Sequence, residues 1–278
     1  MRNLEIGVCS WSLQVTSIPE LEKWLGEVGA SFVQLALGDP HHATWKEGDR
    51  LVAAARKASF QITATMIGFP GEDYTTPETI RRTGGFGDAA RRRERLDIVR
   101  WAVDRTAELG MEILTAHAGF IPEPGVPDRG PFIDAIGDAV DYAASKDIVV
   151  AFETGQESAD LLRRTIDEID SPNLKVNFDP ANMILYNTGD PIRALEPLAP
   201  DIVHVHVKDA TYPTAPGQWG TEVPLGAGEV GIKEYVEELL RLGYTGPLVV
   251  EREVGNQKER ARDIAAGIRL LKKILAGG

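Results

Sequence analysis

Apolar runs rich in β-branched residues recur along the chain, and each run is followed by a segment with helical periodicity. The runs cover residues 4–9, 32–37, 60–66, 111–116, 148–152, 174–178, 202–207 and 248–250. Strands of a parallel sheet that is covered on both faces have this continuous apolar character. Eight such units in a chain of 278 residues match the size of a (β/α)₈ barrel. Since no Pro/Ser-rich linker interrupts the pattern, we expect an α/β protein with a single (β/α)₈ TIM-barrel domain over residues 1–278.

The connections between the predicted elements differ in length on the two faces of the barrel. Segments that enter strands are short, whereas three segments that leave strands are long, namely residues 67–88, 118–130 and 209–230. Active sites of such barrels lie where the strands end, and long loops in compact domains are usually functional. The asymmetry therefore predicts a covered pocket, as in an enzyme. We expect residues 67–88, which include Phe69, Tyr74 and Phe86, to form part of a lid.

Composition and charge exclude several classes of partner. The net charge of −12 argues against nucleic acid, because proteins that bind it usually have a basic face. The densest basic run, residues 91–95, opens a helical pattern and is expected to be a solvated helix face. No signal-peptide pattern is visible, and no apolar run approaches the roughly 20 residues that span a bilayer. The single cysteine, Cys9, suits a reducing compartment. We expect a cytoplasmic protein without a membrane or nucleic-acid partner, with Cys9 as a small core residue.

Titratable residues stand at the ends of five consecutive predicted strands. They are His117, Glu153, Asp179, His206 and Glu251. A single histidine or carboxylate in this position is usually a hydrogen-bonded residue of the barrel mouth, but five at one level are hard to ascribe to coincidence. Carboxylates gathered in this way repel one another unless they are protonated or neutralised by a cation. The pattern therefore predicts a divalent metal ion at this end of the barrel.

Residues 201–210, DIVHVHVKDA, combine a strand pattern with several polar side chains. Because side chains alternate along a strand, His204, His206 and Lys208 share one face, and the intervening valines share the other. We expect the valines to pack on helices while the polar face points into the barrel. His206 is expected to be a metal ligand near the rim, with Lys208 above it in the mouth. His204 is expected one layer deeper, as a buried histidine with a hydrogen-bond partner.

Four short motifs follow one another at the ends of the last four predicted strands: FETG, NFDPAN, HVHVKD and VVERE. In this combination the chain resembles the xylose isomerase-like barrel superfamily, and within it the sugar isomerase/epimerase branch that includes ketose 3-epimerases and inosose dehydratases. The resemblance extends from GVCSWSL at the first strand to the last helix. It implies that Glu153, Asp179, His206 and Glu251 bind one divalent metal ion.

Two departures from the family pattern limit what the resemblance implies. The similar epimerases have a substrate-binding histidine three residues beyond the aspartate, where this chain has Asn182. The related apurinic endonucleases build a multi-zinc cluster from additional histidines, whereas this chain has five histidines, two of them in the pair His41-His42. A single-metal site is therefore expected, and the substrate of the epimerases does not carry over.

The implied ligand set of three carboxylates and one imidazole suits Mn²⁺, Mg²⁺ or Co²⁺, with Zn²⁺ as an alternative. An ion that holds the carbonyl and the neighbouring hydroxyl oxygen of a ketose stabilises an enediolate. Glu153 and Glu251 end strands three positions apart around the ring, and we expect them to be the catalytic pair that removes and returns a proton. His117, Asn182 and Lys208 are the expected substrate-binding residues.

Three further features have two interpretations each. Trp11 and Trp219 are candidates for stacking on a sugar face, with packing in the core or a lid as the alternative. The backbone of Gly226-Ala227-Gly228 is able to approach a phosphate, but no P-loop pattern is present and a plain turn is expected.

Three classes of function are open at this point. The first is a metal-dependent isomerase or epimerase that acts on a ketose or keto-sugar. The second is a lyase or dehydratase that uses the same residues on a keto-sugar, keto-glycoside or inosose. The third is a sugar-binding module without activity, against which the intact ligand set argues. The expected partner is a small sugar in each class, and assembly into a homo-oligomer is left open.

Overall fold

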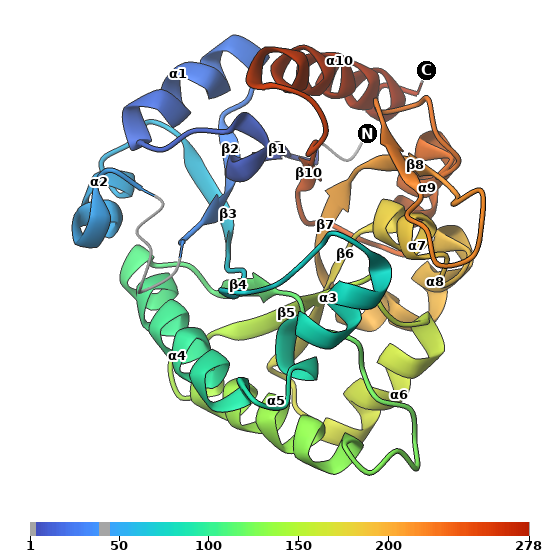
Figure 1. The fold of residues 1–278 in the computed structure, drawn as a ribbon. Helices are drawn as coiled ribbons and strands as arrows, with labels where there is room; N and C mark the ends of the chain where they lie inside the picture. Colours follow the sequence, from blue (N-terminus) through green and yellow to red (C-terminus); the bar gives the residue numbers. More distant parts are fainter. Residues whose placement is uncertain (1–3, 39–44, 278) are drawn as a thin grey trace.

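Eight parallel strands form a closed barrel in the computed structural model, which describes residues 4–38 and 45–277 (Figure 1). The order around the barrel is β1, β10, β7, β6, β5, β4, β3, β2, and every strand pairs in parallel with both neighbours. The strands are β1 (Ile6–Cys9), β2 (Phe32–Ala36), β3 (Gln61–Met66), β4 (Ile113–Ala116), β5 (Val149–Glu153), β6 (Leu174–Phe178), β7 (Ile202–Val207) and β10 (Leu248–Val250). The predicted (β/α)₈ TIM barrel is confirmed, with strand limits that differ from the expected ones by at most two residues.

Helices pack around the outside of the barrel (Figure 1). They are α1 (Ile18–Val28), α2 (Leu51–Ala55), α4 (Arg92–Leu109), α5 (Arg129–Ala144), α6 (Ala159–Ile169), α8 (Pro191–Leu198), α9 (Ile232–Arg241) and α10 (Gln257–Leu275). The connections also contain the short helices α3 (Pro77–Thr83) and α7 (Pro180–Tyr186) and the 3₁₀ helices Ser10–Leu13, Gly48–Arg50, Gly85–Gly87 and Ala199–Asp201. In the described part of the chain, no helix is both long and apolar enough to cross a membrane.

Strand β7 shows how the sequence pattern divides the inside of the barrel from its outer surface. Val205 and Val207 are fully buried and belong to the hydrophobic core. His204 and His206 are equally buried, but their ring nitrogens contact polar side chains of other barrel strands. The alternation thus separates apolar packing from a polar interior, as predicted.

The segment that follows β7 contains structure that the sequence pattern does not predict. Residues 209–230 were expected to be an irregular loop, but they include an antiparallel hairpin of β8 (Asp209–Thr211) and β9 (Thr221–Val223). The buried carboxylate of Asp209 accepts hydrogen bonds from the amides of Gly226, Gly228 and Val230, at 2.9, 2.9 and 3.2 Å. A Cβ at Gly228 would lie 2.2 Å from Asp209 Oδ1, so the turn requires glycine there. The glycine stretch is therefore a turn that binds a carboxylate of the chain itself.

The loop after β3 is held in place by the basic run at the start of α4. Arg95 is 1% exposed and donates to the carbonyl oxygens of Thr83 and Gly85. Arg92 donates to the carbonyl of Phe86 and to Asp128. The prediction that this run is a solvated helix face is therefore wrong for these two arginines. Periodicity did not reveal their role because carbonyl groups of the preceding loop, rather than apolar contacts, place them inward.

Candidate metal centre and active site

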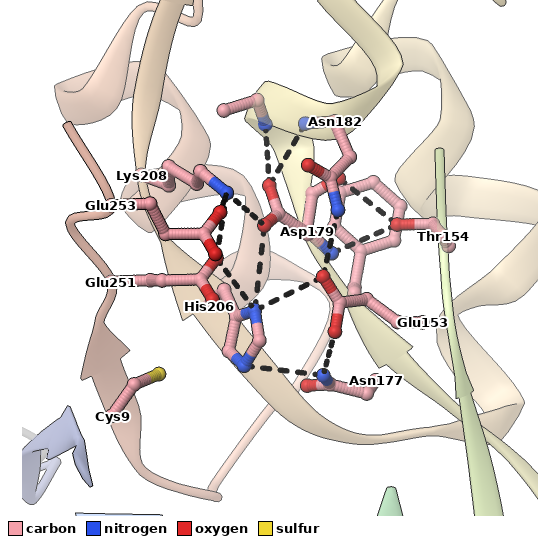
Figure 2. Close-up of polar contacts among 12 residues, drawn as sticks. Cys9, Glu153, Thr154, Asn177, Asp179, Asn182, His206, Lys208, Glu251 and Glu253 are labelled. Atoms are coloured by element: carbon pink, nitrogen blue, oxygen red, sulfur yellow. Dashed lines mark hydrogen bonds and ion pairs between the residues drawn. The ribbon is translucent and has the colours of Figure 1, made fainter. Parts of the chain in front are cut away.

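Four predicted ligands meet at the carboxyl-terminal end of the barrel strands. Glu153 ends β5, Asp179 follows β6, His206 lies in β7 and Glu251 follows β10. One ligand atom from each of the four lies within 4.8 Å of the others, and all four side chains are buried. Figure 2 shows them converging from neighbouring strands. The structure thus brings together residues that are as far as 98 positions apart in the sequence, from Glu153 to Glu251.

The imidazole of His206 is at the centre of this cluster. Its Nδ1 lies 3.4 Å from Asp179 Oδ2, 3.5 Å from Glu153 Oε1 and 3.4 Å from Glu251 Oε2 (Figure 2). A ring nitrogen carries at most one proton and donates to one acceptor, and these separations exceed a normal N–H···O distance. Hydrogen bonding alone therefore does not account for three carboxylate oxygens around one nitrogen.

The donor set fits a divalent cation. Three carboxylate oxygens and one imidazole nitrogen are ligands that Mn²⁺, Mg²⁺, Co²⁺ and Zn²⁺ accept. Donor atoms bound at about 2.0–2.2 Å to one ion lie roughly 3–3.6 Å apart, and the three contacts of His206 Nδ1 fall in this range. The group of Glu153, Asp179, His206 and Glu251 is therefore able to hold a metal ion.

Asp179 is held with one oxygen free for the cluster. It is the N-cap of α7, where Oδ1 accepts hydrogen bonds from the amides of Ala181 and Asn182 at 2.8 and 3.0 Å. The backbone of Asp179 is also fixed, because Thr154 Oγ1 lies 2.8 Å from its amide and 3.0 Å from its carbonyl. The Asp-Pro pair of the NFDPAN motif is thus a helix start, with proline at the first helical position. This start leaves Oδ2 facing His206.

The orientation of His206 is set from the opposite side of the barrel. Its Nε2 lies 2.7 Å from Oε1 of Gln34 on β2, and Gln34 Nε2 donates to Thr115 Oγ1 at 2.7 Å. Thr115 in turn donates to the carbonyl of Thr65 at 2.8 Å. This series of hydrogen bonds makes Gln34 Oε1 an acceptor. The Nε2 proton of His206 therefore points toward Gln34, which leaves Nδ1 for the carboxylates. Sequence analysis missed Gln34, because a single glutamine inside an apolar strand has no motif.

The charges of the cluster shift the ionisation of its members in different directions. Burial would lower the pKa of His206, but the surrounding acidic groups raise it well above its usual value. Burial raises the pKa of Asp179 despite the nearby ammonium of Lys208. At Glu251 the attraction to Lys208 and His206 outweighs burial and holds the pKa well below the usual value. Several carboxyl groups in one buried site thus depend on positive charge for their ionisation.

Lys208 lies beside the cluster, as the alternation along β7 predicted. Its Nζ is 2.9 Å from Glu251 Oε2, 2.6 Å from Glu253 Oε2 and 4.0 Å from Asp179 Oδ2 (Figure 2). These carboxylates outweigh burial and raise the pKa of Lys208 well above its usual value, so it is an ammonium. Glu253 is a second residue that sequence analysis missed, although it stands in the VVERE motif. Alternation from Glu251 was the signal that would have identified it.

The remaining predicted site residues lie around Glu153. His117 Nε2 is 3.7 Å from Glu153 Oε2, and Asn182 Nδ2 donates to Glu153 Oε1 at 2.7 Å. His204 lies deeper, with Nδ1 2.9 Å from Asn177 Oδ1 and Nε2 3.1 Å from Thr63 Oγ1. Burial lowers the pKa of His204 well below its usual value, so it is a neutral, hydrogen-bonded histidine, as expected. The His41-His42 pair lies outside the described residues.

A pocket of about 1050 Å³ lies above the cluster. Its lining includes the predicted site residues Glu153, Glu251, His117, Asn182 and Lys208. Aromatic side chains also line it: Phe69 and Tyr74 from the loop after β3, and Trp11, Tyr186 and Trp219 from other segments. Phe86 packs behind Phe69, with ring centroids 5.9 Å apart. The loop of residues 67–88 therefore forms one wall of the pocket, and its action as a lid stays a prediction.

Cys9 is next to the cluster but lacks the character of a thiolate ligand. It is fully buried, and its Sγ lies 3.4 Å from Gln34 Oε1. Its sulfur lies within 4.8 Å of ligand atoms of His206 and Glu251, the same limit that the four main donors meet. Burial raises the pKa of the thiol far above its usual value, so Cys9 is a neutral core residue, in agreement with its predicted role.

Comparison with known proteins agrees with the fold. A xylose isomerase domain protein from Planctomyces limnophilus is 34% identical, with a TM-score of 0.89 and 98% of both chains covered. The L-ribulose-5-phosphate 3-epimerase UlaE of Escherichia coli is 26% identical over 190 residues, 65% of this chain. That match covers 64% of UlaE, so the chain spans just under two thirds of this curated relative.

A third similarity concerns the fold alone. The probable 3-DHS dehydratase AsbF from Bacillus anthracis is 17% identical, with a TM-score of 0.68 and coverage of 97% of this chain and 99% of AsbF. An L-ribulose 3-epimerase and a probable 3-DHS dehydratase thus share this barrel. Residues 23–274 match the family described as xylose isomerase-like TIM barrel. The chain therefore belongs to the xylose isomerase-like TIM barrel family.

Proposed function

We propose that the protein is a divalent-metal-dependent isomerase or epimerase that acts on a ketose or keto-sugar. One observation carries the proposal: the buried cluster of Glu153, Asp179, His206 and Glu251 lies at a pocket large enough for a sugar, which Glu153 and Glu251 line. These residues would hold the ion, with Mn²⁺, Mg²⁺ or Co²⁺ favoured by the oxygen-rich donor set. The partner in this proposal is a small sugar, since a net charge of −12 disfavours nucleic acid.

The bound ion would supply polarisation of the substrate carbonyl, which makes the neighbouring C–H group more acidic. The chain itself supplies the bases. Glu153 and Glu251 belong to β5 and β10, which are separated by β6 and β7 around the barrel. They therefore flank a substrate that lies over His206. A base on each side is what inversion at one carbon requires, because the proton leaves one face and returns to the other.

Each glutamate has one oxygen for the cluster and one for proton transfer. Glu153 directs Oε1 to His206 and Oε2 toward His117. Glu251 directs Oε2 to His206, while its Oε1 accepts a hydrogen bond from Trp11 Nε1 at 2.6 Å. We assign proton removal and return to Glu153 Oε2 and Glu251 Oε1. Isomerisation needs the same groups and differs in the carbon to which the proton returns.

Three further side chains position the substrate in this proposal. Lys208 places an ammonium beside Glu251 and is suited to bind an oxygen on which negative charge develops. Asn182 keeps Glu153 oriented through the bond to Oε1 and offers its own amide oxygen to a hydroxyl. His117 is suited to bind a hydroxyl next to the carbon that Glu153 deprotonates.

A lyase or dehydratase is the second candidate. Elimination begins with the same proton removal and then needs an acid at the leaving group. His117, whose Nε2 lies 3.7 Å from Glu153 Oε2, is placed to be that acid. The similarity of the fold to AsbF is consistent with this chemistry. The product separates the two candidates, because elimination yields an unsaturated sugar.

Proton exchange tests the proposal directly. Protein loaded with Mn²⁺ or Mg²⁺ is incubated in D₂O with a panel of ketoses, and NMR follows deuterium at the carbon next to the carbonyl. We expect metal-dependent exchange, and at least a roughly 100-fold loss of turnover in Glu153→Gln and Glu251→Gln. Glu237→Gln on the exposed face of α9 is the matched control. Exchange that Glu251→Gln retains without product formation supports two bases, whereas full turnover in that variant contradicts the epimerase.

A further inference from the structure

The wall of the pocket is acidic. Five glutamates line it: Glu72, Glu153, Glu222, Glu251 and Glu253. Among the described residues that line the pocket, Lys208 is the single lysine or arginine. Residues 39–44, whose sequence is DPHHAT, contain neither lysine nor arginine. A phosphate dianion entering this pocket would therefore meet an excess of like charge, which a single bound divalent ion only partly offsets.

Two cations near the pocket, Lys208 and Arg252, have carboxylate partners, and a third, Arg260, donates to the carbonyl oxygens of Trp11, Glu253 and Gly255. Lys208 pairs with Glu251 and Glu253 at 2.9 and 2.6 Å. Arg252, behind the wall, pairs with Glu222 at 2.6 Å and Asp263 at 3.2 Å. To bind a phosphate, either side chain would have to leave a buried carboxylate uncompensated, which is costly.

The backbone amides of the turn at residues 226–228 offer no phosphate site either. The glycine-rich turn at residues 226–228 is the segment whose backbone pattern most resembles one. Its amides at Gly226 and Gly228 donate to the carboxylate of Asp209. A resident carboxylate thus occupies the position that an anionic ligand would need.

One side of the pocket, lined by Tyr186 and Trp219, is aromatic. The rings of Tyr186 and Trp219 contact edge to face, with centroids 4.7 Å apart. Tyr186 lies one helical turn after Asn182 on α7, and Asn182 contacts Glu153 at 2.7 Å. One turn of helix rises about 5.4 Å, so the backbone of Tyr186 lies about that far along α7 from the backbone of Asn182. Trp219 Nε1 is buried and has no hydrogen-bond partner among the described residues.

The size of the pocket exceeds what one sugar ring fills. Its volume of about 1050 Å³ lies just above the roughly 300–1,000 Å³ typical of sites for drug-sized ligands. A monosaccharide is smaller than such ligands. Half-exposed Tyr74 and Val254 at the mouth extend the apolar wall away from the floor.

We propose that the substrate is an unphosphorylated keto-sugar that carries a second uncharged ring, as in a glycoside. The reacting ring lies over Glu153 and Glu251, and the second ring lies against Tyr186 and Trp219. This inference rests on the proposed function for the position of the reacting ring. The excess of carboxylates in the pocket supports a substrate without phosphate, and the rings of Tyr186 and Trp219 support a second sugar ring.

The affinities of the protein for three commercial probes test both the absence of a phosphate group and the presence of a second ring in the substrate. The rise in melting temperature of the Mg²⁺-loaded protein, measured against probe concentration, gives dissociation constants without any turnover. The probes are D-fructose, D-fructose 6-phosphate and maltulose, which is fructose with a glucosyl ring. We expect maltulose to bind at least about tenfold more tightly than fructose, and the phosphate at least about tenfold more weakly. Equal or tighter binding of fructose 6-phosphate than fructose, or no advantage for maltulose, overturns the proposal.

A substitution at the aromatic wall tests where the second ring lies. Trp219→Ala should weaken maltulose binding by about three- to tenfold, and by more than it weakens fructose binding, since stacking contributes about 0.5–1.5 kcal/mol. Trp24→Ala on α1, outside the pocket, is the matched control. An equal loss for both probes contradicts the assigned position. If the proposed reaction is wrong, solvent exchange fails for every ketose while this ranking of affinities persists, so the two failures are distinguishable.

Discussion

The two halves of the barrel interior differ in the chemistry of their side chains. The half formed by β5, β6, β7 and β10 contributes carboxylates, histidines and a lysine to the site. The half formed by β1, β2, β3 and β4 faces it with neutral groups, among them Cys9, Gln34, Met66 and Thr115. We call these the charged half and the neutral half. The charged groups therefore occupy four adjacent strands instead of being spread around the ring.

The difference indicates that the two halves have different roles: the charged half provides the candidate metal ligands, and the neutral half orients them. The charged half gathers groups that would repel one another without a cation. The neutral half meets it through single hydrogen bonds, such as Gln34 to His206 at 2.7 Å and Thr63 to His204 at 3.1 Å. A neutral partner fixes a ring without adding charge to a site that already has an excess of it.

Substitution of a candidate metal ligand in the charged half should have the largest effect on metal affinity. In Asp179→Asn, the cluster loses a negative oxygen, and we expect metal affinity to fall by more than the roughly 10–100-fold seen when outer partners of ligands are removed. Metal content after dialysis, followed by calorimetric titration with Mn²⁺, measures this. Asp141→Asn, on the exposed face of α5, is the control. Unchanged metal content in Asp179→Asn would count against the ligand assignment.

Breaking the neutral half should have an intermediate effect. Gln34→Leu removes the acceptor for His206 Nε2–H, so the ring loses its preferred tautomer and orientation. We expect metal affinity to fall by about 10–100-fold. Gln34→Glu keeps an acceptor oxygen and should recover most of the affinity. If both variants bind metal like the original protein, the orienting role of the neutral half is wrong.

Sequence reasoning reached the charged half more completely than the neutral half. Glu153, Asp179, His206 and Glu251 each end a strand in a distinctive motif, and their register places them at one level of the barrel. Gln34 escaped notice because its function depends on a partner 172 positions away, which no local pattern encodes. Charged residues are conspicuous in apolar strands, whereas a lone glutamine is compatible with many buried roles.

The same limit applies to the loops. The lengths of the connections predicted which face carries the pocket, but not the β8–β9 hairpin or the buried position of Arg95. Both depend on contacts between separate segments. Asp209 holds three amides of the turn at residues 226–230, and Arg95 holds two carbonyls of the loop after β3. Helical and strand periodicity reflects packing on the core and does not predict such hydrogen bonds between segments.

Substitution in the loop after β3, which follows a strand of the neutral half, should give the smallest effect. Tyr74 lines the pocket, and its ring centroid lies 6.4 Å from that of His117. Tyr74→Ala should raise KM about three- to tenfold through lost contact area, with metal affinity unchanged. Steady-state kinetics and Mn²⁺ titration separate the two quantities. A fall in metal affinity instead would show that the loop supports the cluster and does not merely wall the pocket.

The central claim is that one divalent ion binds among the four side chains of the charged half. Anomalous diffraction from crystals soaked in Mn²⁺ tests it most directly. We predict a single strong peak bonded to His206 Nδ1 and to one or more oxygens each of Glu153, Asp179 and Glu251, at about 2.0–2.3 Å. The Nε2 of His206 should still contact Gln34. A peak elsewhere, no peak at saturating Mn²⁺, or an ion bound through His206 Nε2 would contradict the account.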